Sequence, residues 1–156
     1  KKYLVIENNR FHSKTNSDDP SPIRMISAMK LFKNIIIRNN DGLKGGLAID
    51  INGTDGQGDN SGDVFIINNE GNHTDLRIRD LKSNIYVKGN TLLGLTRSIA
   101  FLRNGIVTCI NNITENATIT FDQNELSLYG FNRRLDDLEN TLGHIGLPAE
   151  NLENIV

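Results

Sequence analysis

The chain has 156 residues, with 17 Lys and Arg against 19 Asp and Glu and a formal net charge of −2. That length fits one domain with a sizeable core. The near-neutral charge argues against an electrostatic surface for nucleic acid or an anionic membrane, and no apolar run approaches the roughly 18 residues of a membrane span. We therefore expect no nucleic-acid partner and no membrane insertion.

The first element is a strand motif, called here the strand phrase, that is repeated along the chain. Apolar residues alternate with other residues, and each copy closes on Asn or Gly followed by Asn. Alternation of period two predicts β-strands, and recurrence every 20 to 30 residues is typical of a solenoid. Because the chain opens on Lys1 almost directly into this phrase, we expect it to be a fragment of a longer protein. The five copies are residues 4–9, 35–40, 64–69, 85–90 and 107–112.

A second alternating segment precedes each later copy of the phrase. Two strands and their turns per coil are what a parallel β-helix requires, because each coil buries its inner face only against its opposite wall and the neighbouring coils. The sequence therefore predicts an all-β fold, a parallel β-helix of about five coils. The preceding segments are residues 23–27, 47–51, 76–79 and 99–102.

Alternation also assigns sides, because successive side chains of a strand face opposite ways. The phrase predicts two inward aliphatic columns, represented by Ile35 and Ile37 in the second copy. The two positions that follow predict a corner, since Asn and Gly tolerate the left-handed backbone conformation. Stacked amides can also bond from coil to coil.

The pattern changes after Asn112. Residues 117–121 and 126–129 predict a final β-hairpin or an incomplete coil. From Leu128 onward, apolar residues step by three and four, which predicts a short helix with Asn132 as its N-cap. That helix either caps the β-helix or joins copies of the chain. The predicted organisation is coils over residues 1–115, a hairpin or incomplete coil over 116–130, and a helical cap or oligomerisation segment over 131–156.

The repeated strand and its Asn corner resemble the right-handed parallel β-helix of the pectate-lyase-like superfamily. The resemblance covers roughly residues 3–112. Among those proteins, Asn-rich coils followed by a short β element and a heptad stub are most similar to the C-terminal part of phage tailspikes and appendages. The resemblance implies a homotrimer that binds or cuts cell-surface polysaccharide, in the virion or outside the cell. No active-site motif of the superfamily matches residue by residue, so no catalytic role is carried over.

One set of outward positions is apolar where an isolated β-helix would be polar. A contiguous exposed apolar row usually marks an interface, so these positions and the heptad leucines predict a self-association surface. The alternative is that long loops fold back over the row. The predicted interface residues are Val5, Ile36, Phe65, Tyr86, Leu135, Leu138 and Leu142.

The other strand of each coil has polar outward positions. A wall that mixes Asp and Arg suits an anionic glycan through charge-assisted hydrogen bonds, and the predicted ligand-binding residues are Arg24, Asp50, Arg77 and Arg79. Asp50 is also a candidate general acid or base. Asp63 and Asp75 are candidates for the second carboxylate that a hydrolase needs. The alternative is the solvated face of a solenoid.

Metal and cofactor sites are not expected. The acidic stretch 50–63 lacks the Gly and the closing Glu of an EF-hand. The three histidines are scattered, with no zinc-ligand spacing. Cys109 lies on an alternating apolar face and is interpreted as core.

These observations leave three functions open. The first is a segment of a trimeric phage fibre or tailspike that binds polysaccharide. The second is a secreted bacterial polysaccharide lyase or glycoside hydrolase, and whether the chain is an enzyme stays open. The third is a purely structural spacer.

Overall fold

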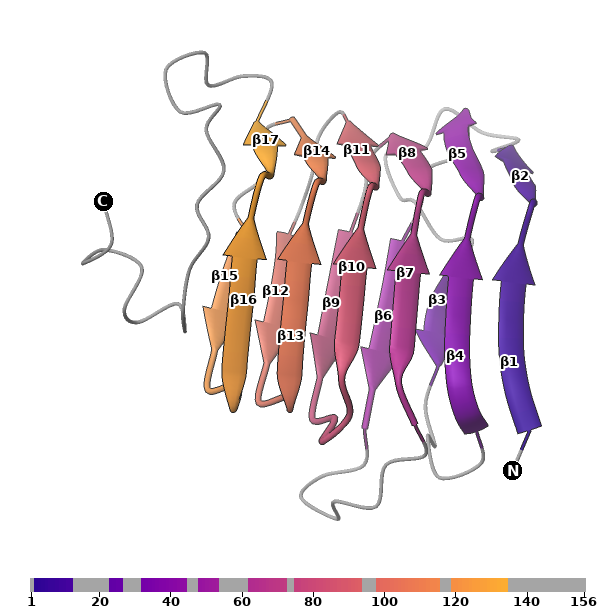
Figure 1. The fold of residues 1–156 in the computed structure, drawn as a ribbon. Helices are drawn as coiled ribbons and strands as arrows, with labels where there is room; N and C mark the ends of the chain where they lie inside the picture. The colour runs from indigo at the N-terminus through magenta and orange to yellow at the C-terminus, as the bar shows by residue number, and fades with distance from the viewer. Residues whose placement is uncertain are drawn as a thin grey trace.

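A computed structural model describes residues 2–12, 23–26, 32–44, 48–53, 62–72, 75–93, 98–115 and 119–134. Within these ranges every regular element is a β-strand, and all strand pairs are parallel. The strands form three sheets, which we call A, B and C (Figure 1). The described part of the chain is therefore all-β and built from stacked parallel sheets.

The chain visits the three sheets in turn. Neighbours in a sheet are three strands apart in sequence, as in the order β1-β4-β7 of sheet A. We call one pass through A, B and C a coil, and this winding is consistent with a parallel β-helix. Sheet A contains β1 (Lys2–Glu7), β4 (Phe32–Arg38), β7 (Val64–Ile67), β10 (Ile85–Lys88), β13 (Ile106–Ile110) and β16 (Leu126–Gly130).

Sheet B is built from very short strands and follows the Asn corner. Its members are β2 (Arg10–His12), β5 (Asp41–Lys44), β8 (Glu70–Asn72), β11 (Thr91–Leu93), β14 (Ile113–Thr114) and β17 (Arg133–Arg134). The prediction of two strands per coil was therefore wrong, because a third strand of two to four residues follows each corner. Segments that short carry almost no alternation signal.

Sheet C is made from the second alternating segment of each coil. It contains β3 (Ile23–Ile26), β6 (Ala48–Asn52), β9 (Asp75–Arg79), β12 (Ser98–Leu102) and β15 (Ile119–Asp122). In Figure 1 its arrows run opposite to those of sheet A, which lies in front of it.

The core consists of the inward columns of sheets A and C. Ile35, Val64, Ile85 and Val107 share one register position, and each is at most 1% exposed. Burying such a side chain stabilises the fold by about 1.5–3 kcal/mol. The predicted inward columns are confirmed, and each coil depends on its neighbours to bury them.

The corner between sheets A and B has the predicted left-handed backbone. Asn8, Asn39, Asn68 and Asn111 have φ values between 52° and 56°, and Gly89 takes the same position at 66°. Asn reaches this region at lower cost than most residues, and Gly reaches it freely. The sequence pattern at this corner therefore has a direct backbone cause.

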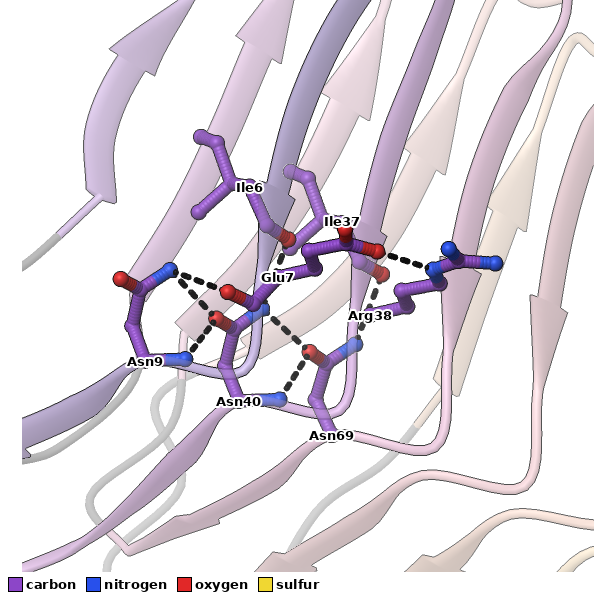
Figure 2. A network of polar contacts seen from close by, with 7 residues as sticks. All are labelled: Ile6, Glu7, Asn9, Ile37, Arg38, Asn40 and Asn69. Atoms are coloured by element: carbon purple, nitrogen blue, oxygen red, sulfur yellow. Dashed lines mark hydrogen bonds and ion pairs between the residues drawn. The ribbon is translucent and has the colours of Figure 1, made fainter.

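The next corner position forms a ladder of amides. The backbone N–H and Nδ2 of Asn9 both donate to Oδ1 of Asn40, at 3.1 and 3.0 Å, and Asn40 repeats the pair onto Asn69 (Figure 2). Nδ2 of Asn40 also donates to the carbonyl oxygen of Ile6 in the coil before it. The ladder continues through Asn90, Asn112 and Asn132. It therefore satisfies buried donors at every corner, as buried polar groups require.

A second, shorter ladder lies at the corner between sheets C and A. The backbone N–H of Asn104 donates to Oδ1 of Asn124 at 2.9 Å, and Nδ2 of Asn104 donates to the carbonyl of Ile78 at 2.9 Å. Asp80 and Arg103 occupy the left-handed position here, with φ values of 59° and 51°. The later coils are thus closed by amides at two corners.

The segment predicted as a hairpin or an incomplete coil has the strand pairing of a coil. β15 pairs in parallel with β12 and β16 with β13, so 119–130 continues the stack instead of folding on itself. Asn132 is not a helix N-cap, because its Oδ1 accepts from Asn112 and its Nδ2 donates to the Cys109 carbonyl. The rest of the expected C-terminal helix lies outside the described residues.

Candidate functional site

Two neighbouring strands of sheet C carry a polar patch on their outer face. Asp50 of β6 is in register with Arg77 of β9, and Asn52 with Arg79. The intervening residues, Ile49 and Ile51 on β6 among them, are buried in the core, so alternation places the polar set on the opposite side. We call Asp50, Asn52, Arg77 and Arg79 the β6–β9 patch.

Three polar atoms of this patch are buried and have no hydrogen-bond partner: Oδ1 of Asp50, Oδ1 of Asn52 and Nε of Arg79. The ion pair between Asp50 Oδ2 and Arg79 Nη2 is long, at 3.7 Å. The Asp50 and Arg79 side chains are 22% and 32% exposed, so neither is freely solvated. An unsatisfied buried polar atom costs about 1–3 kcal/mol. Three such atoms together indicate that the β6–β9 patch binds a ligand or ordered water.

The hydrogen-bonding chemistry of the three atoms limits the classes of ligand that would fit the patch. Two are oxygens that accept hydrogen bonds, and one is a guanidinium N–H that donates. A hydroxyl group both donates and accepts, so neighbouring hydroxyls would satisfy the two oxygens and the nitrogen together. A ligand that carried only acceptors, such as a phosphate, would satisfy Arg79 and be repelled by Asp50.

The other predicted site residues, Asp75, Arg24 and Asp63, lie at different places relative to this patch. Asp75 is in register with Ala48, two residues before Asp50, so its backbone lies on the neighbouring strand of the same sheet. Arg24 lies on β3, inside the stretch where the β3–β6 register shifts. Asp63 directly precedes β7 of sheet A and therefore belongs to another wall. The predicted residues Asp50, Arg77 and Arg79 are brought together, and Asp63 is not among them.

Asn52 was not among the predicted ligand-binding residues, because the predicted strand segment ended at residue 51. β6 runs through Asn52, and the side chain lies two residues beyond Asp50, on the same face. The period-two pattern of residues 48–52 contained this signal. The Gly after it obscured the strand's last residue.

The predicted apolar interface positions form a continuous row on the outside of sheet A. Val5, Ile36, Phe65 and Tyr86 occupy one register position on successive strands. Val5 is 45% exposed, and the other three are half-buried. Thr108 interrupts the row, and Leu128, which is 37% exposed, resumes it. Leu135, Leu138 and Leu142 lie outside the described residues.

Two aromatic rings stack within this row. The Phe65 and Tyr86 ring centroids are 5.0 Å apart, with planes inclined by 8°. One face of each ring is therefore occupied by the other ring. This leaves less free aromatic face than a flat saccharide platform would present, and it favours packing against another apolar surface.

The free cysteine of the described residues offers no reactive site. Cys109 is buried in the core, and burial raises the pKa of its thiol from 9.0 to about 12, against a smaller lowering by the Asn112 amide. Such a thiol stays protonated and unreactive at neutral pH. Among the described residues, no group of three His, Cys, Asp or Glu side chains is placed to hold a metal ion.

Comparisons with protein-family models, with curated proteins and with solved structures found no match. In the part of the chain that the structure describes, no helix is long and apolar enough to span a membrane. The β6–β9 patch and the apolar row of sheet A are therefore the features of the described residues that bear on function.

Proposed function

We propose that this chain is a segment of a trimeric parallel β-helix, of the kind found in phage tailspikes and fibres, that binds cell-surface polysaccharide. In this proposal the β6–β9 patch contacts the saccharide, and the outer row of sheet A joins the subunits. Both surfaces lie on the outside of the stack, so the core needs no rearrangement for either contact. The side chains of the β6–β9 patch must shift to expose their buried atoms to a ligand. The protein would act in the virion or outside the cell.

The observation that carries saccharide binding is the set of unpartnered buried atoms on Asp50, Asn52 and Arg79. A pair of sugar hydroxyls supplies the donors that the two oxygens lack and the acceptor that the guanidinium lacks. Hydrogen bonds to charged groups contribute more than neutral ones. A repeating polysaccharide would also extend across neighbouring coils, whose outer faces continue the same wall.

The test is binding to a panel of purified bacterial capsular and O-antigen polysaccharides, measured by calorimetry. Asp50→Ala should weaken binding about tenfold or more, because it removes a charged partner. Glu70→Ala is the control, since Glu70 is an exposed acidic residue on β8 of sheet B, away from the wall that carries the patch. Equal affinities for both variants, or no binding to any polysaccharide, would contradict the proposal.

The proposed trimer is supported by the exposed apolar row of sheet A. Self-association would bury Val5 and the half-exposed Ile36, Phe65 and Tyr86, which water otherwise contacts. Light scattering of the full chain at micromolar concentration should give three times the monomer mass. Phe65→Glu should release monomers, whereas Lys82→Glu, an exposed change between β9 and β10 and outside sheet A, should leave the trimer intact. A monomeric parent chain would exclude this surface as the subunit interface.

A polysaccharide hydrolase or lyase is the second candidate, and the relation of Asp75 to Asp50 favours it. The two Cα atoms are separated by one strand spacing and two residues of rise, about 8 Å in all. Glycoside hydrolysis needs two carboxylic residues close to one another, and this backbone register brings two such residues onto neighbouring strands. Release of reducing ends by the parent chain, abolished in both Asp50→Asn and Asp75→Asn, would support an enzyme. Binding without release would leave an adhesin.

A further inference from the structure

The first coil is less well covered than the interior of the stack. Interior members of the inward columns, such as Ile35 and Ile37, are at most 1% exposed. In the first coil, Leu4 and Ile6 occupy the inward columns but are only partly buried. The core therefore ends open on the side of β1.

The amide ladder is open at the same end. In each interior step, Oδ1 of one Asn accepts from the backbone N–H and the Nδ2 of the Asn in the coil before it, as Asn69 does from Asn40. No described residue donates to Oδ1 of Asn9, the first member, and its side chain is exposed. Asn9 thus presents an acceptor that every later member of the ladder has filled.

The backbone of β1 is an open edge as well. Among the described strands, β1 pairs only with β4, and their register is continuous from Leu4–Ile35 to Glu7–Arg38. The register irregularity of this pair lies earlier, between Lys2 and Leu4. An unpaired strand edge is a template for a further strand, and the regular part of β1 is the part next to Asn9.

We propose that the open face of the first coil, formed by β1 from Leu4 to Glu7 together with Asn9, is a docking surface for one further β-helical coil. The occupant is a strand parallel to β1 with alternating aliphatic residues and an Asn at its corner. This repeats the interface that five successive Asn pairs already form within the chain.

A second copy of the chain does not fit this surface. Two first coils placed edge to edge would pair β1 antiparallel with β1, so Asn9 of each copy would face the start of the other β1 and not a ladder amide. The last coil of another copy is less well suited, because its β16 presents Ser127 and Tyr129 at the inward positions instead of two aliphatic residues. The chemistry that fits is a coil whose backbone N–H and Nδ2 point toward Oδ1 of Asn9, as those of Asn40 point toward Oδ1 of Asn69.

The test is to add such a coil to the full chain. A copy of residues 64–81, which contains β7, β8 and β9, is joined ahead of Lys1. Leu4 then follows the copied Leu81 by four positions, as Ile85 does in the chain itself. Amide hydrogen exchange over residues 4–9 should slow by about tenfold or more, because each new hydrogen bond must open before exchange occurs.

Two controls separate docking from the effect of a longer chain. An added copy with Val64→Asp and Ile66→Asp loses its inward face and should leave exchange in β1 as fast as in the original chain. An added copy with Asn69→Ala keeps its strand but lacks the side-chain donor for Asn9, so protection near Asn9 should fall.

A second variant carries a copy of residues 85–103 in place of the copy of residues 64–81. It provides the same test if the first added copy does not fold. Slower exchange in β1 with either copy, together with normal exchange in the Asp control, supports the proposal. If neither copy slows exchange in β1, or if the Asp control slows it equally, the first coil is not a docking surface for a further coil.

Discussion

Asn69 uses both its backbone N–H and its side-chain amide on a single atom, Oδ1 of Asn90, at 3.0 and 2.9 Å. Both residues are fully buried. One side chain therefore joins three coils, because Nδ2 of Asn69 also reaches the carbonyl of Ile37 at 3.0 Å, and its Oδ1 accepts from Asn40.

Asn69→Ala should lower the free energy of unfolding by about 3–5 kcal/mol, because it leaves the Asn40 donors and the Ile37 carbonyl buried without partners. Urea unfolding followed by circular dichroism measures the change. Asn68→Gly is the neighbouring control. Asn68 is exposed at a φ of 52°, which Gly adopts freely, so the change should stay within about 0.5 kcal/mol. Equal losses of unfolding free energy in the two variants would show that the amide ladder does not stabilise the fold.

Gly89→Ala should destabilise the chain by about 1–3 kcal/mol through its left-handed φ of 66°. The new Cβ would also collide with Oδ1 of Asn68. Adding Asn68→Gly removes that contact and leaves the backbone strain. The double variant should therefore be more stable than the sum of the two single effects, and strict additivity would contradict the contact.

The stability of the chain should fall as pH rises from about 9 to 12. Burial raises the pKa of Cys109 to about 12, so the folded state keeps a proton that the unfolded state releases above 9.0. Where the folded state binds more protons, stability decreases with pH, by about 1.4 kcal/mol per pH unit for one group. Burial also raises the pKa of Tyr129, which acts in the same direction.

Cys109→Val isolates the thiol contribution to this pH dependence. Val87 occupies the same register position one coil earlier, so the replacement suits the column. The variant should show a shallower fall in unfolding free energy above pH 9 than the parent chain. An unchanged slope would mean that the thiol is not desolvated in the folded state.

Much of this architecture is predictable from the sequence because its signals repeat. The alternation of residues such as Ile35 and Ile37, and the Asn after each strand, reflect burial and backbone conformation at every coil. Sheet B was missed because a strand such as Ile113–Thr114 is too short to show a period. Asn104 and Asn124 were missed because their ladder has only two members, which do not stand out in an Asn-rich chain.

The candidate site is less predictable than the fold. Alternation places Asp50 and Arg77 on the outer face of sheet C, as expected. Which of these side chains lack partners depends on side-chain positions across two strands, and no pattern within one strand encodes that. Asn132 shows the same limit, because an N-cap and a ladder Asn have the same local sequence.

Coils that stack in register bring methyl groups of neighbouring strands into contact, and measuring these contacts tests the stacking most directly. Ile37, Ile66 and Val87 share one register position on β4, β7 and β10. With specific methyl labelling, the nuclear Overhauser spectrum should connect Ile37 to Ile66 and Ile66 to Val87. It should not connect Ile37 to Val87, two strand spacings or about 9.6 Å apart. Absence of both predicted connections would contradict the stacked coils.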